Sequence, residues 1–487
     1  MTQRVVNISI LIVILVGFGL RVYHLGRDSF WNDEAGQALA AIQPTIDGTL
    51  KIAQGHAMAM PMDYLVSRIV SKVGTVETVM RFPSLIWGTM TLALCFVFFK
   101  RISRPEVAVI ATWLLALSAS HIYYSQEMRF YAALSFFWLL SNLLLFRALI
   151  HSSMLAWVQF VLVTALGSYF HPYVLLAICS GFLYFFARQS RIRINDKNLL
   201  ALIASSILLA VLFLPGYLYF GENQSLGYPL FLWGGSLIKT TASGLGWRAI
   251  KYAETSAQFG IWELLNIGFT GMGAIVLYKE RAQRRISLSI AVGVGVQVVL
   301  IILADWVKGY PYVSRQILHL MPIVQLVAAI GIISSVESIA SRFALPYTRN
   351  LVLFGLMIGI SLSAIPRLFD YYDFSRGNGK QVVSELTQLY QPHELIFVIP
   401  GYEEKIYRWY SLKAGDMNEI DQALRPTSWE QLERDMSENS MTSYLITPSI
   451  ISDAHLDTLA SLGFTPLLQP KVNANLSRIL FTRKERN

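Results

Sequence analysis

The chain has 487 residues, of which 54% are hydrophobic and only 15% are charged. Soluble domains carry about 25% charged residues, so this composition excludes an ordinary soluble globular protein. Apolar runs recur along the chain at roughly 20 residues each, the length that crosses a bilayer. The sequence therefore predicts a polytopic α-helical membrane protein. A net charge of +9 could indicate a nucleic-acid partner, but the basic residues concentrate in loops between the apolar runs.

We expect about eleven transmembrane helices from the length and periodicity of these runs. The first run is long for a signal peptide and lacks a small-residue cleavage site, so we expect it to be retained. Cys95 and Cys179 lie inside apolar runs, which supports neither a disulfide framework nor a thiolate metal site. The runs lie at 5–24, 79–99, 105–123, 131–150, 154–170, 172–187, 199–220, 261–278, 286–304, 316–336 and 350–368.

The positions of the basic residues predict the orientation. Cytoplasmic loops are rich in Lys and Arg, and with a cytoplasmic amino terminus the alternate short loops carry most of them. The opposite short loops carry only Arg129, Lys308 and Arg315. We therefore expect an integral protein of the inner or plasma membrane and no nucleic-acid partner. The basic loop residues are Lys100, Arg101, Arg104, Arg147, Arg188, Arg191, Arg193, Lys197, Lys279, Arg281, Arg284, Arg285, Arg342 and Arg349.

Two domains are expected: a transmembrane domain over residues 1–369, with long outer loops at 26–78 and 221–260, and a soluble extracytoplasmic domain over 370–487. The tail alternates strand and helix patterns, which predicts a small α/β domain on a mostly parallel sheet. Its expected strands are "ELIFVIP", "SYLITPS" and "SRILFTRK". Its expected helices are "GKQVVSELTQLY", "EEKIYRWYSL", "SWEQLERDMSE" and "DAHLDTLASLG".

Polar residues that could carry chemistry gather on the predicted outer side. Charged groups at membrane depth are costly and usually functional. Other interpretations remain open: Asn32 or Asp33 could cap a helix over 34–42, and Arg129 and Arg315 could be snorkelling residues at the interface. The candidates are Asp33, Glu34, His56, Gln126, Glu127, Arg129, His171, Lys308, Tyr310 and Arg315.

Five short stretches together resemble a known superfamily. They read "RVYHLGRDSFWNDEA", "PMDYL", "RFPSLIWG", "SQEMRFYA" and "SRQILHLMP", and span Arg21–Ala35, Pro61–Leu65, Arg81–Gly88, Ser125–Ala132 and Ser314–Pro322. In this order the chain resembles the GT-C superfamily of integral-membrane glycosyltransferases, over roughly its first 330 residues. The branch of protein O-mannosyltransferases and lipid A aminoarabinose transferases is the most similar. The lysine that the aminoarabinose branch carries before paired prolines is missing here, where Met58, Ala59 and Met60 precede Pro61.

The resemblance implies an inverting glycosyltransferase. Such an enzyme moves a hexose or pentose from a polyprenyl phosphate to a hydroxyl of a lipid, glycan or protein on the outer face of the membrane. A phosphate is already a good leaving group, so the two facing carboxylates of a glycoside hydrolase are not needed. The reaction instead needs one base for the acceptor hydroxyl and cations for the departing phosphate.

The resemblance assigns the catalytic base to Asp33. Glu34 then positions the site or reaches an acceptor or a metal. Arg129 and Arg315 are the expected phosphate contacts, because the planar guanidinium grips phosphate oxygens. Lys308 and His171 are weaker candidates for the same role. Substrate contacts are expected from His56, Gln126, Glu127 and Tyr310.

Metal use stays open, because no metal-ligand spacing appears on one element. The alternative function is a transporter or flippase of lipid-linked sugars without transfer chemistry. Against it, no pair of interrupted spans recurs in corresponding halves of the chain. A catalytically inactive relative is a third possibility, but Asp33 is present.

Overall fold

The computed structural model describes most of the chain as two compact units. The first comprises Met1–Tyr23, Leu50–Val66 and Phe82–Tyr371, and the second comprises His24–Thr49, Ser67–Arg81 and Tyr372–Asn487. The described residues are 2–56, 59–188, 196–221, 237–246, 260–279, 284–310, 312–343, 347–392, 394–413, 418–438, 443–448, 453–468 and 478–483.

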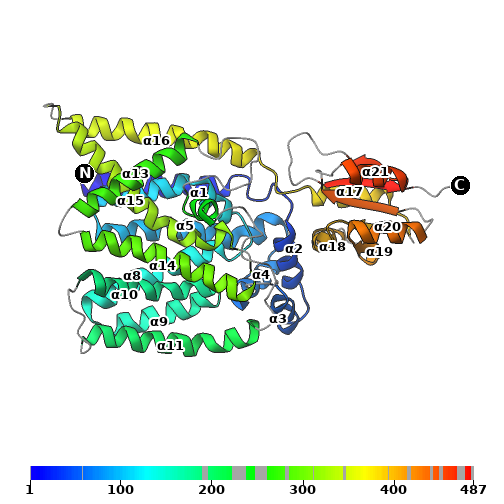
Figure 1. The fold of residues 1–487 in the computed structure, drawn as a ribbon, viewed down its shortest axis with the longest axis horizontal. Coiled ribbons are helices and arrows are strands. Elements are labelled where there is room, and N and C mark those ends of the chain that lie inside the picture. The colour runs from blue at the N-terminus through cyan, green and yellow to red at the C-terminus, as the bar shows by residue number, and fades with distance from the viewer. Residues whose placement is uncertain are drawn as a thin grey trace. The chain divides into compact units, whose positions relative to one another are not determined.

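The first unit consists of helices (Figure 1), and each of the eleven predicted apolar runs coincides with a helix or a pair of consecutive helices. The helices that carry these runs are α1 (Gln3–Val22), α5 (Glu77–Ile102), α6 (Pro105–Leu117), α7 (Ala119–Ser125), α8 (Tyr131–His151), α9 (Met154–Ser168), η1 (Pro172–Leu176), α10 (Ala177–Arg188), α11 (Lys197–Phe220), α13 (Ile261–Lys279), α14 (Arg284–Lys308), η2 (Ser314–Leu320), α15 (Met321–Ala340) and α16 (Thr348–Asp373). The remaining helices before the tail are α2 (Asn32–Ala41), α3 (Ile46–Gln54), α4 (Pro61–Ser71) and α12 (Leu237–Gly244).

Within the described part of the chain, eight helices are long and apolar enough to cross a membrane, or nine if the bent pair α6–α7 is one span. The runs at 154–170 and 172–187 form shorter apolar helices. The span Ser314–Ala340, which joins η2 and α15, is 83% buried over an 18-residue apolar stretch, whereas that of α16 is 17% buried. The span with α15 is therefore central and α16 peripheral. The prediction of a polytopic helical membrane protein is confirmed.

The break between α6 and α7 is a bend of 66°. Pro105 is the first residue of α6. The N–H of a first helical residue has no partner within the helix, so its absence in proline costs nothing. Ser118 separates the two helices and caps α7, because its hydroxyl accepts the His121 N–H. Buried Arg21 donates to two carbonyls at the bend, Leu115 O at 3.4 Å and Ala116 O at 3.3 Å. Arg21 thereby joins α1 to the bend.

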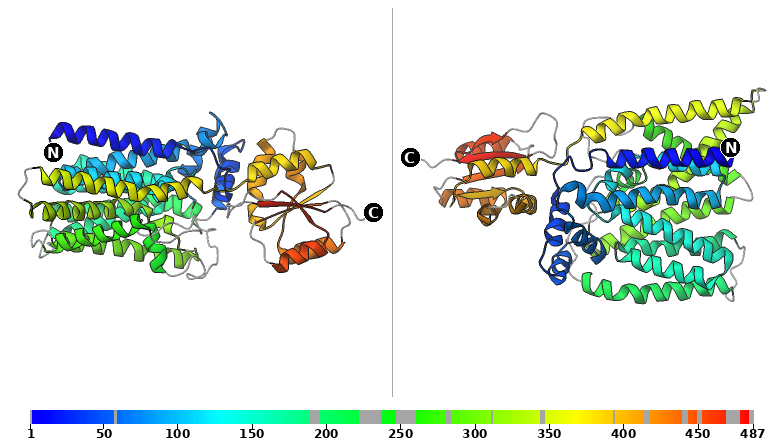
Figure 2. Two further views of the ribbon diagram at one scale, coloured as in Figure 1. Left: turned by 90° about the horizontal axis from the view of Figure 1, so that it is seen from above. Right: turned by 180° about the vertical axis from the view of Figure 1, so that it is seen from behind.

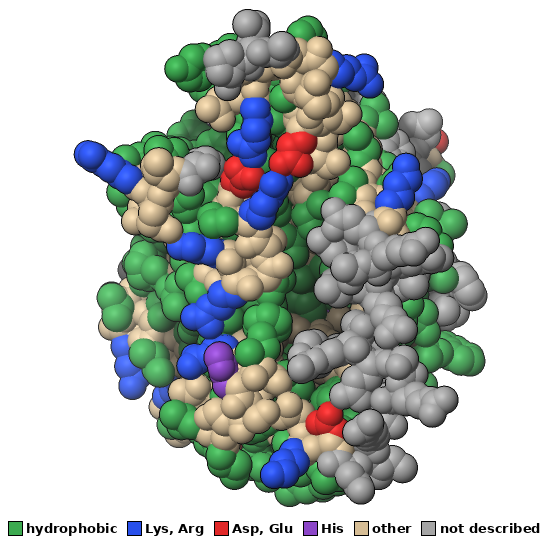
Figure 3. Space-filling view, turned by 90° about the vertical axis from the view of Figure 1, so that its left-hand side faces the viewer, with side chains coloured by type: hydrophobic (Ala, Val, Ile, Leu, Met, Phe, Trp, Pro, Cys, Tyr) green, Lys and Arg blue, Asp and Glu red, His purple; other side chains and the backbone are tan. Residues whose placement is uncertain are grey.

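Lys and Arg side chains are spread over one end of the helical unit, with few acidic side chains among them (Figure 3). The basic last turns of α5, with Lys100 and Arg101, and of α13, with Lys279, belong to the predicted cytoplasmic loops. Some of the charge is neutralised by ion pairs, such as Arg104–Glu337 at 2.7 Å and Arg349–Glu106 at 2.7 Å. Arg191, Arg193 and Arg281 lie outside the described residues, as does most of the predicted outer loop 221–260.

The second unit contains a five-stranded sheet in the order β2-β1-β3-β5-β4. Strand β3 is parallel to β1, and β1 to β2, whereas β5 is antiparallel to both β3 and β4. Only β5 is therefore reversed, which confirms the prediction of a mostly parallel sheet. The strands are β1 (Leu395–Val398), β2 (Leu424–Pro426), β3 (Ser443–Pro448), β4 (Thr465–Leu468) and β5 (Arg478–Arg483).

Helices cover both faces of this sheet (Figure 2). The four expected helices of the tail are present, together with two short helices that were not predicted. On one face, Phe397, Leu445 and Phe481 pack with Leu432 of α20 and Leu459 of α21. The alternate residues of the strands point to the opposite face. The helices of the tail are α17 (Gly379–Leu389), η3 (Gly401–Glu403), α18 (Glu404–Lys413), α19 (Asn418–Ala423), α20 (Trp429–Glu438) and α21 (Asp453–Ser461).

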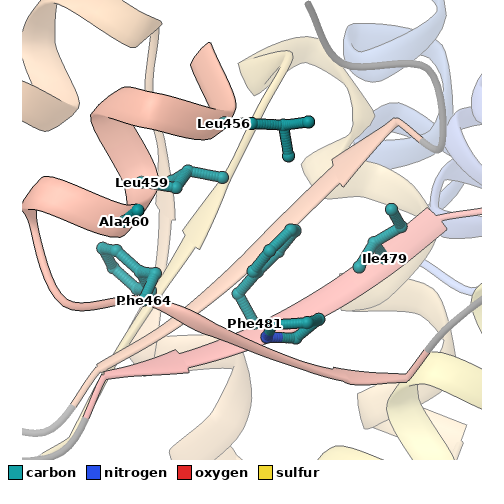
Figure 4. Close-up of a pocket in the computed structure, with 7 residues that line it drawn as sticks. Leu456, Leu459, Ala460, Phe464, Ile479 and Phe481 are labelled. Atoms are coloured by element: carbon teal, nitrogen blue, oxygen red, sulfur yellow. The ribbon is translucent and has the colours of Figure 1, made fainter. Parts of the chain in front are cut away.

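An apolar cavity of about 450 Å³ lies beside α21, β4 and β5 (Figure 4). The seven lining residues that the structure describes are all apolar, so none of them offers a titratable group for catalysis. They are Leu456, Leu459, Ala460, Phe464, Pro466, Ile479 and Phe481.

Candidate functional site

The predicted site residues fall into two sets. Asp33 and Glu34 belong to the second compact unit, and the remaining candidates belong to the first. Each set is built by its own helices and turns.

Asp33 and Glu34 lie in the first turn of α2. The helix begins at Asn32, with Trp31 as the capping residue, so the alternative that Asn32 or Asp33 caps the helix is wrong. The cap lies at Trp31, one residue earlier than expected. Glu34, the third helical residue, accepts the Trp31 N–H at 3.4 Å. Asp33 is half-buried and Glu34 is fully buried.

Glu34 forms a bidentate ion pair with Arg81. The Arg81 Nε donates to Glu34 Oε1 at 2.8 Å, and its Nη2 donates to Oε2 at 2.7 Å. The side chains are 2% and 0% exposed, so the pair is shielded from water. Arg81 also donates to three backbone carbonyls of the segment before α2, those of Leu25, Asp28 and Ser29, at 3.0 to 3.2 Å.

This ion pair fixes the segment that leads into Asp33. Both Glu34 oxygens bond to Arg81, so their contacts are those of a positioning residue. Asp33, one residue earlier, points in another direction around the helix. Its place in the first turn sets it near the positive end of the helix dipole. Sequence reasoning did not select Arg81, although it begins the quoted "RFPSLIWG" stretch.

In the first unit, several candidates surround Tyr131 at the start of α8. Arg315 lies over the Tyr131 ring, with its guanidinium carbon 5.4 Å from the ring centroid. Arg129, Glu127 and Tyr310 also lie close enough to act on Tyr131 electrostatically. The turn between α7 and α8 brings Glu127 and Arg129 together, through an Arg129 N–H that donates to Glu127 O at 2.7 Å. Two guanidinium groups and one buried carboxylate therefore share this region.

His56 is linked to Arg129 through Tyr64 of α4. The His56 Nδ1 and the Tyr64 hydroxyl are 2.8 Å apart, and Arg129 Nη1 donates to the same hydroxyl at 3.5 Å. His56 is half-buried, whereas Tyr64 is completely buried. The structure thus brings His56 into the arginine cluster by way of one phenol.

His171 lies beside the cluster as a neutral group. It is buried, and its ring is 4.5 Å from the ring of Phe130, over which Arg129 also lies. Its Nδ1 accepts the Tyr173 N–H at 3.2 Å, so Nδ1 carries no proton and Nε2 is the donor. His171 can therefore donate a hydrogen bond without adding a positive charge.

Two other candidates make their contacts elsewhere. The Gln126 amide donates to the carbonyls of Arg21 and Tyr23 at the end of α1, at 2.8 and 2.6 Å. Lys308 donates to Gly221 O at 2.8 Å, at the end of α11. Both side chains thus donate hydrogen bonds to carbonyls at the ends of helices. Such a structural role is the alternative to a contact with substrate.

Asp305 and His319 are buried polar residues that the predicted site did not include. Asp305 Oδ1 accepts a hydrogen bond from the Tyr173 hydroxyl at 2.6 Å. Neither ring nitrogen of His319 has a hydrogen-bond partner among the described residues. An acid directly after the apolar run 286–304 was a usable signal for Asp305. His319 lies in the quoted stretch "SRQILHLMP", to which the resemblance assigns a phosphate contact only through Arg315.

A metal would need several ligands converging. Within the described ranges, no group of three His, Cys, Asp or Glu side chains is placed to hold a metal ion.

The chain is similar to known proteins in part of its sequence and in its fold. Residues 56–219 match the family model described as dolichyl-phosphate-mannose-protein mannosyltransferase. No curated protein sequence matches the chain.

Solved structures share the fold at low sequence identity. ArnT from Cupriavidus metallidurans, bound to undecaprenyl phosphate, matches with a TM-score of 0.53 and 9% identity, over 99% of this chain and 98% of that one. The oligosaccharyltransferase of Archaeoglobus fulgidus in its apo form matches with a TM-score of 0.56 and 10% identity, over 92% and 70%. The AglB oligosaccharyltransferase of the same organism, with an inhibitory peptide and a dolichol phosphate, gives 0.54 and 11%, over 91% and 69%. The family model and the common fold confirm the resemblance to the GT-C superfamily of integral-membrane glycosyltransferases.

Proposed function

We propose that the protein is an inverting glycosyltransferase that moves a sugar from a polyprenyl-phosphate carrier to an acceptor hydroxyl on the outer face of the membrane. The observation that carries the proposal is the cluster of Arg129, Arg315, Glu127 and His171 around the start of α8. Further support comes from the relatives, since ArnT binds undecaprenyl phosphate and AglB binds a dolichol phosphate.

Arg129 and Arg315 are the proposed contacts of the donor phosphate. The Arg129 guanidinium is buried and that of Arg315 is half-buried, and both offer charged N–H donors to an anion. Charge-assisted hydrogen bonds to phosphate are about twice as strong as neutral ones. The phosphate gains charge as its bond to the sugar breaks, so these arginines stabilise the transition state more than the ground state. His171 adds one neutral donor.

Asp33 is the proposed base. It takes the proton of the acceptor hydroxyl while the oxygen attacks the anomeric carbon, and the phosphate leaves with the bonding electrons. The stereochemistry at that carbon inverts because there is one displacement. Glu34 acts through Arg81 by holding α2 and the preceding segment. Glu127, His56 and Tyr310 are proposed to contact the sugar or the acceptor, and Gln126 and Lys308 are retained as weaker candidates.

The proposed orientation follows the basic loops. With the amino terminus in the cytoplasm, the tail and the segment that carries Asp33 lie outside the cytoplasm of a cell membrane. The proposed partners are therefore the lipid-linked donor, membrane lipids, and an acceptor lipid, glycan or protein. The sugar class, hexose or pentose, follows from the donor panel described next.

The test uses the purified full chain with a panel of polyprenyl-phosphate hexoses and pentoses. We expect it to consume at least one lipid-linked donor and to ignore nucleotide sugars supplied as controls. A chain that consumes none of them, but moves a labelled lipid-linked sugar across a liposome bilayer, is a flippase. That outcome would refute the proposal.

A further inference from the structure

Tyr410 of helix α18 bonds to two distant parts of the chain within the second compact unit. Its hydroxyl accepts the Phe30 N–H at 2.7 Å and donates to Glu77 Oε1 at 2.7 Å. Phe30 lies two residues before α2, and Glu77 is the first residue of α5. One phenol from the tail therefore joins the segment before Asp33 to the start of the helix that supplies Arg81.

Neighbouring contacts bring the same elements together. The Trp409 and Phe30 rings lie 5.7 Å apart, and Lys413 Nζ donates to Thr75 O at 2.8 Å. The Lys380 N–H, in α17, donates to the Ser29 hydroxyl at 3.1 Å. Helix α18 is also in contact with α2 itself, next to which it lies in Figure 1.

The two hydrogen bonds of Tyr410 fix the direction in which its hydroxyl proton points. A backbone N–H only donates and a carboxylate only accepts, so the phenol proton must point at Glu77. Burial, together with the adjacent Glu77 carboxylate, raises the pKa of Tyr410. The phenol thus stays protonated at physiological pH and keeps both bonds.

Residues 28–31 are consequently held from two sides. Arg81 donates to the carbonyls of Asp28 and Ser29, while the tail engages the Ser29 side chain and the Phe30 N–H. The next residues are Trp31, Asn32 and Asp33. A backbone fixed on both sides sets the position at which α2 begins.

We infer that Tyr410 is a positioning residue for Asp33, and that the α/β domain serves the reaction by fixing the start of α2. The inference rests on the proposed role of Asp33 and deepens it. It assigns to the tail the task of positioning Asp33. Misplacing a reacting group by about 1 Å can lower the rate about 100-fold.

The first experiment compares Tyr410→Phe with wild type in the full chain, using a lipid-phosphate sugar that wild type consumes. We expect kcat to fall about 10- to 100-fold, with the KM for the donor changing less than about twofold, because the arginine cluster is untouched. Glu77→Gln keeps an acceptor for the Tyr410 hydroxyl, but a neutral and weaker one. We therefore expect kcat to fall in this variant too, by less than in Tyr410→Phe.

The matched control is Tyr444→Phe. The Tyr444 hydroxyl also donates a hydrogen bond within the tail, to Leu389 O at 3.0 Å, but it does so away from the segment before α2. This variant should keep its kcat. An unchanged kcat in Tyr410→Phe, or an equal loss in Tyr444→Phe, would overturn the inference.

A second readout does not depend on catalysis. Hydrogen exchange of the Phe30 amide, measured by mass spectrometry on peptides covering residues 29–36, should become faster in Tyr410→Phe and stay unchanged in Tyr444→Phe. Unchanged exchange in Tyr410→Phe contradicts the inference even if activity falls. If wild type transfers no sugar from any donor, the proposed function fails, while the exchange result still decides whether Tyr410 positions α2.

Discussion

At the scale of single residues, adjacent carboxylates in α2 have different surroundings. Glu34 is completely buried and bonded through both oxygens to Arg81, whereas Asp33 is half-buried in the same helical turn. Neighbouring residues of a helix differ in direction by about 100°, so the pair cannot share one environment. Stability and catalysis can therefore be separated by mutating one residue at a time.

We predict that Glu34→Ala destabilises the protein by about 3–5 kcal/mol, because it leaves the Arg81 charge buried without its partner. Asp33→Asn should change the unfolding free energy by less than about 1 kcal/mol, since it keeps the shape of a half-buried side chain. Both stability changes can be measured by thermal unfolding of the detergent-purified variants, with size-exclusion chromatography to monitor the folded fraction. Equal melting temperatures for wild type and Glu34→Ala would show that the ion pair is not important for stability.

Arg129→Lys tests the proposed phosphate contact. Lysine keeps the charge but loses the planar fork, and we expect the KM for the lipid-phosphate donor to rise about tenfold, the equivalent of about 1.4 kcal/mol. The control is Arg104→Lys at a 51% exposed side chain that pairs with Glu337. Similar KM values for Arg129→Lys and wild type would remove Arg129 from the donor site.

Sequence reasoning found most polar candidates but not their partners. Asp33, Glu34 and Arg129 could be selected because carboxylates and arginines are unusual beside apolar runs. Arg81 was missed because a partner 47 residues away depends on tertiary packing, to which periodicity gives no access. The cap alternative at Asn32 or Asp33 was wrong because α2 begins at Asn32, where Glu34 accepts the Trp31 N–H.

At the scale of elements, α13 and α15 approach each other through glycine. A Cβ added to Gly273 would lie 1.9 Å from Val327 O, and one added to Gly331 would lie 2.0 Å from Phe269 O. Both obstacles are backbone atoms, which cannot move aside as a flexible side chain can. Small residues allow such close packing of membrane helices.

We expect Gly331→Ala to push these helices apart and to destabilise the protein by about 1–3 kcal/mol. The control is Gly271→Ala, also in α13. A Cβ added at Gly271 would have no heavy atom within 4 Å. This variant should be neutral or slightly stabilising, because alanine favours the helix by up to about 1 kcal/mol. Melting temperatures that fall equally in both variants would show that the close approach is not what matters.

The elements themselves were largely predictable. Every predicted apolar run coincides with a helix, because bilayer length and hydrophobicity are properties of the sequence alone. The bend after Leu117 was not predicted, since it depends on Ser118 and on Arg21 from another helix. Strand β2 was missed because three residues are too few for an alternating pattern to show, and β4 was missed because Pro466 lies inside it.

At the scale of the whole molecule, the basic loops predict which side of the membrane each end of the chain faces. A membrane-impermeant thiol reagent should label Glu430→Cys, at an exposed position of α20, in intact cells. Arg101→Cys, in the last turn of α5, should be labelled only after permeabilisation. The reverse pattern would invert the proposed orientation and place the tail in the cytoplasm.

The division into two compact units was not predicted in this form. The second unit takes up His24–Thr49 and Ser67–Arg81 in addition to the tail. Those segments belong to the predicted outer loop, whose polar composition indicates exposure but not a packing partner. The contacts of Arg81 and Tyr410 that hold them involve residues 47 to 380 positions apart in the chain.

The most direct test of the central claim measures donor binding and turnover by wild type and Asp33→Asn under the same conditions. The amide keeps the size of the carboxylate but cannot accept the proton of the acceptor hydroxyl. We predict equal binding of the lipid-phosphate sugar and a turnover lower by about 100- to 10,000-fold, the usual contribution of a general base. Equal turnover by the two proteins would contradict the assignment of Asp33 as the base.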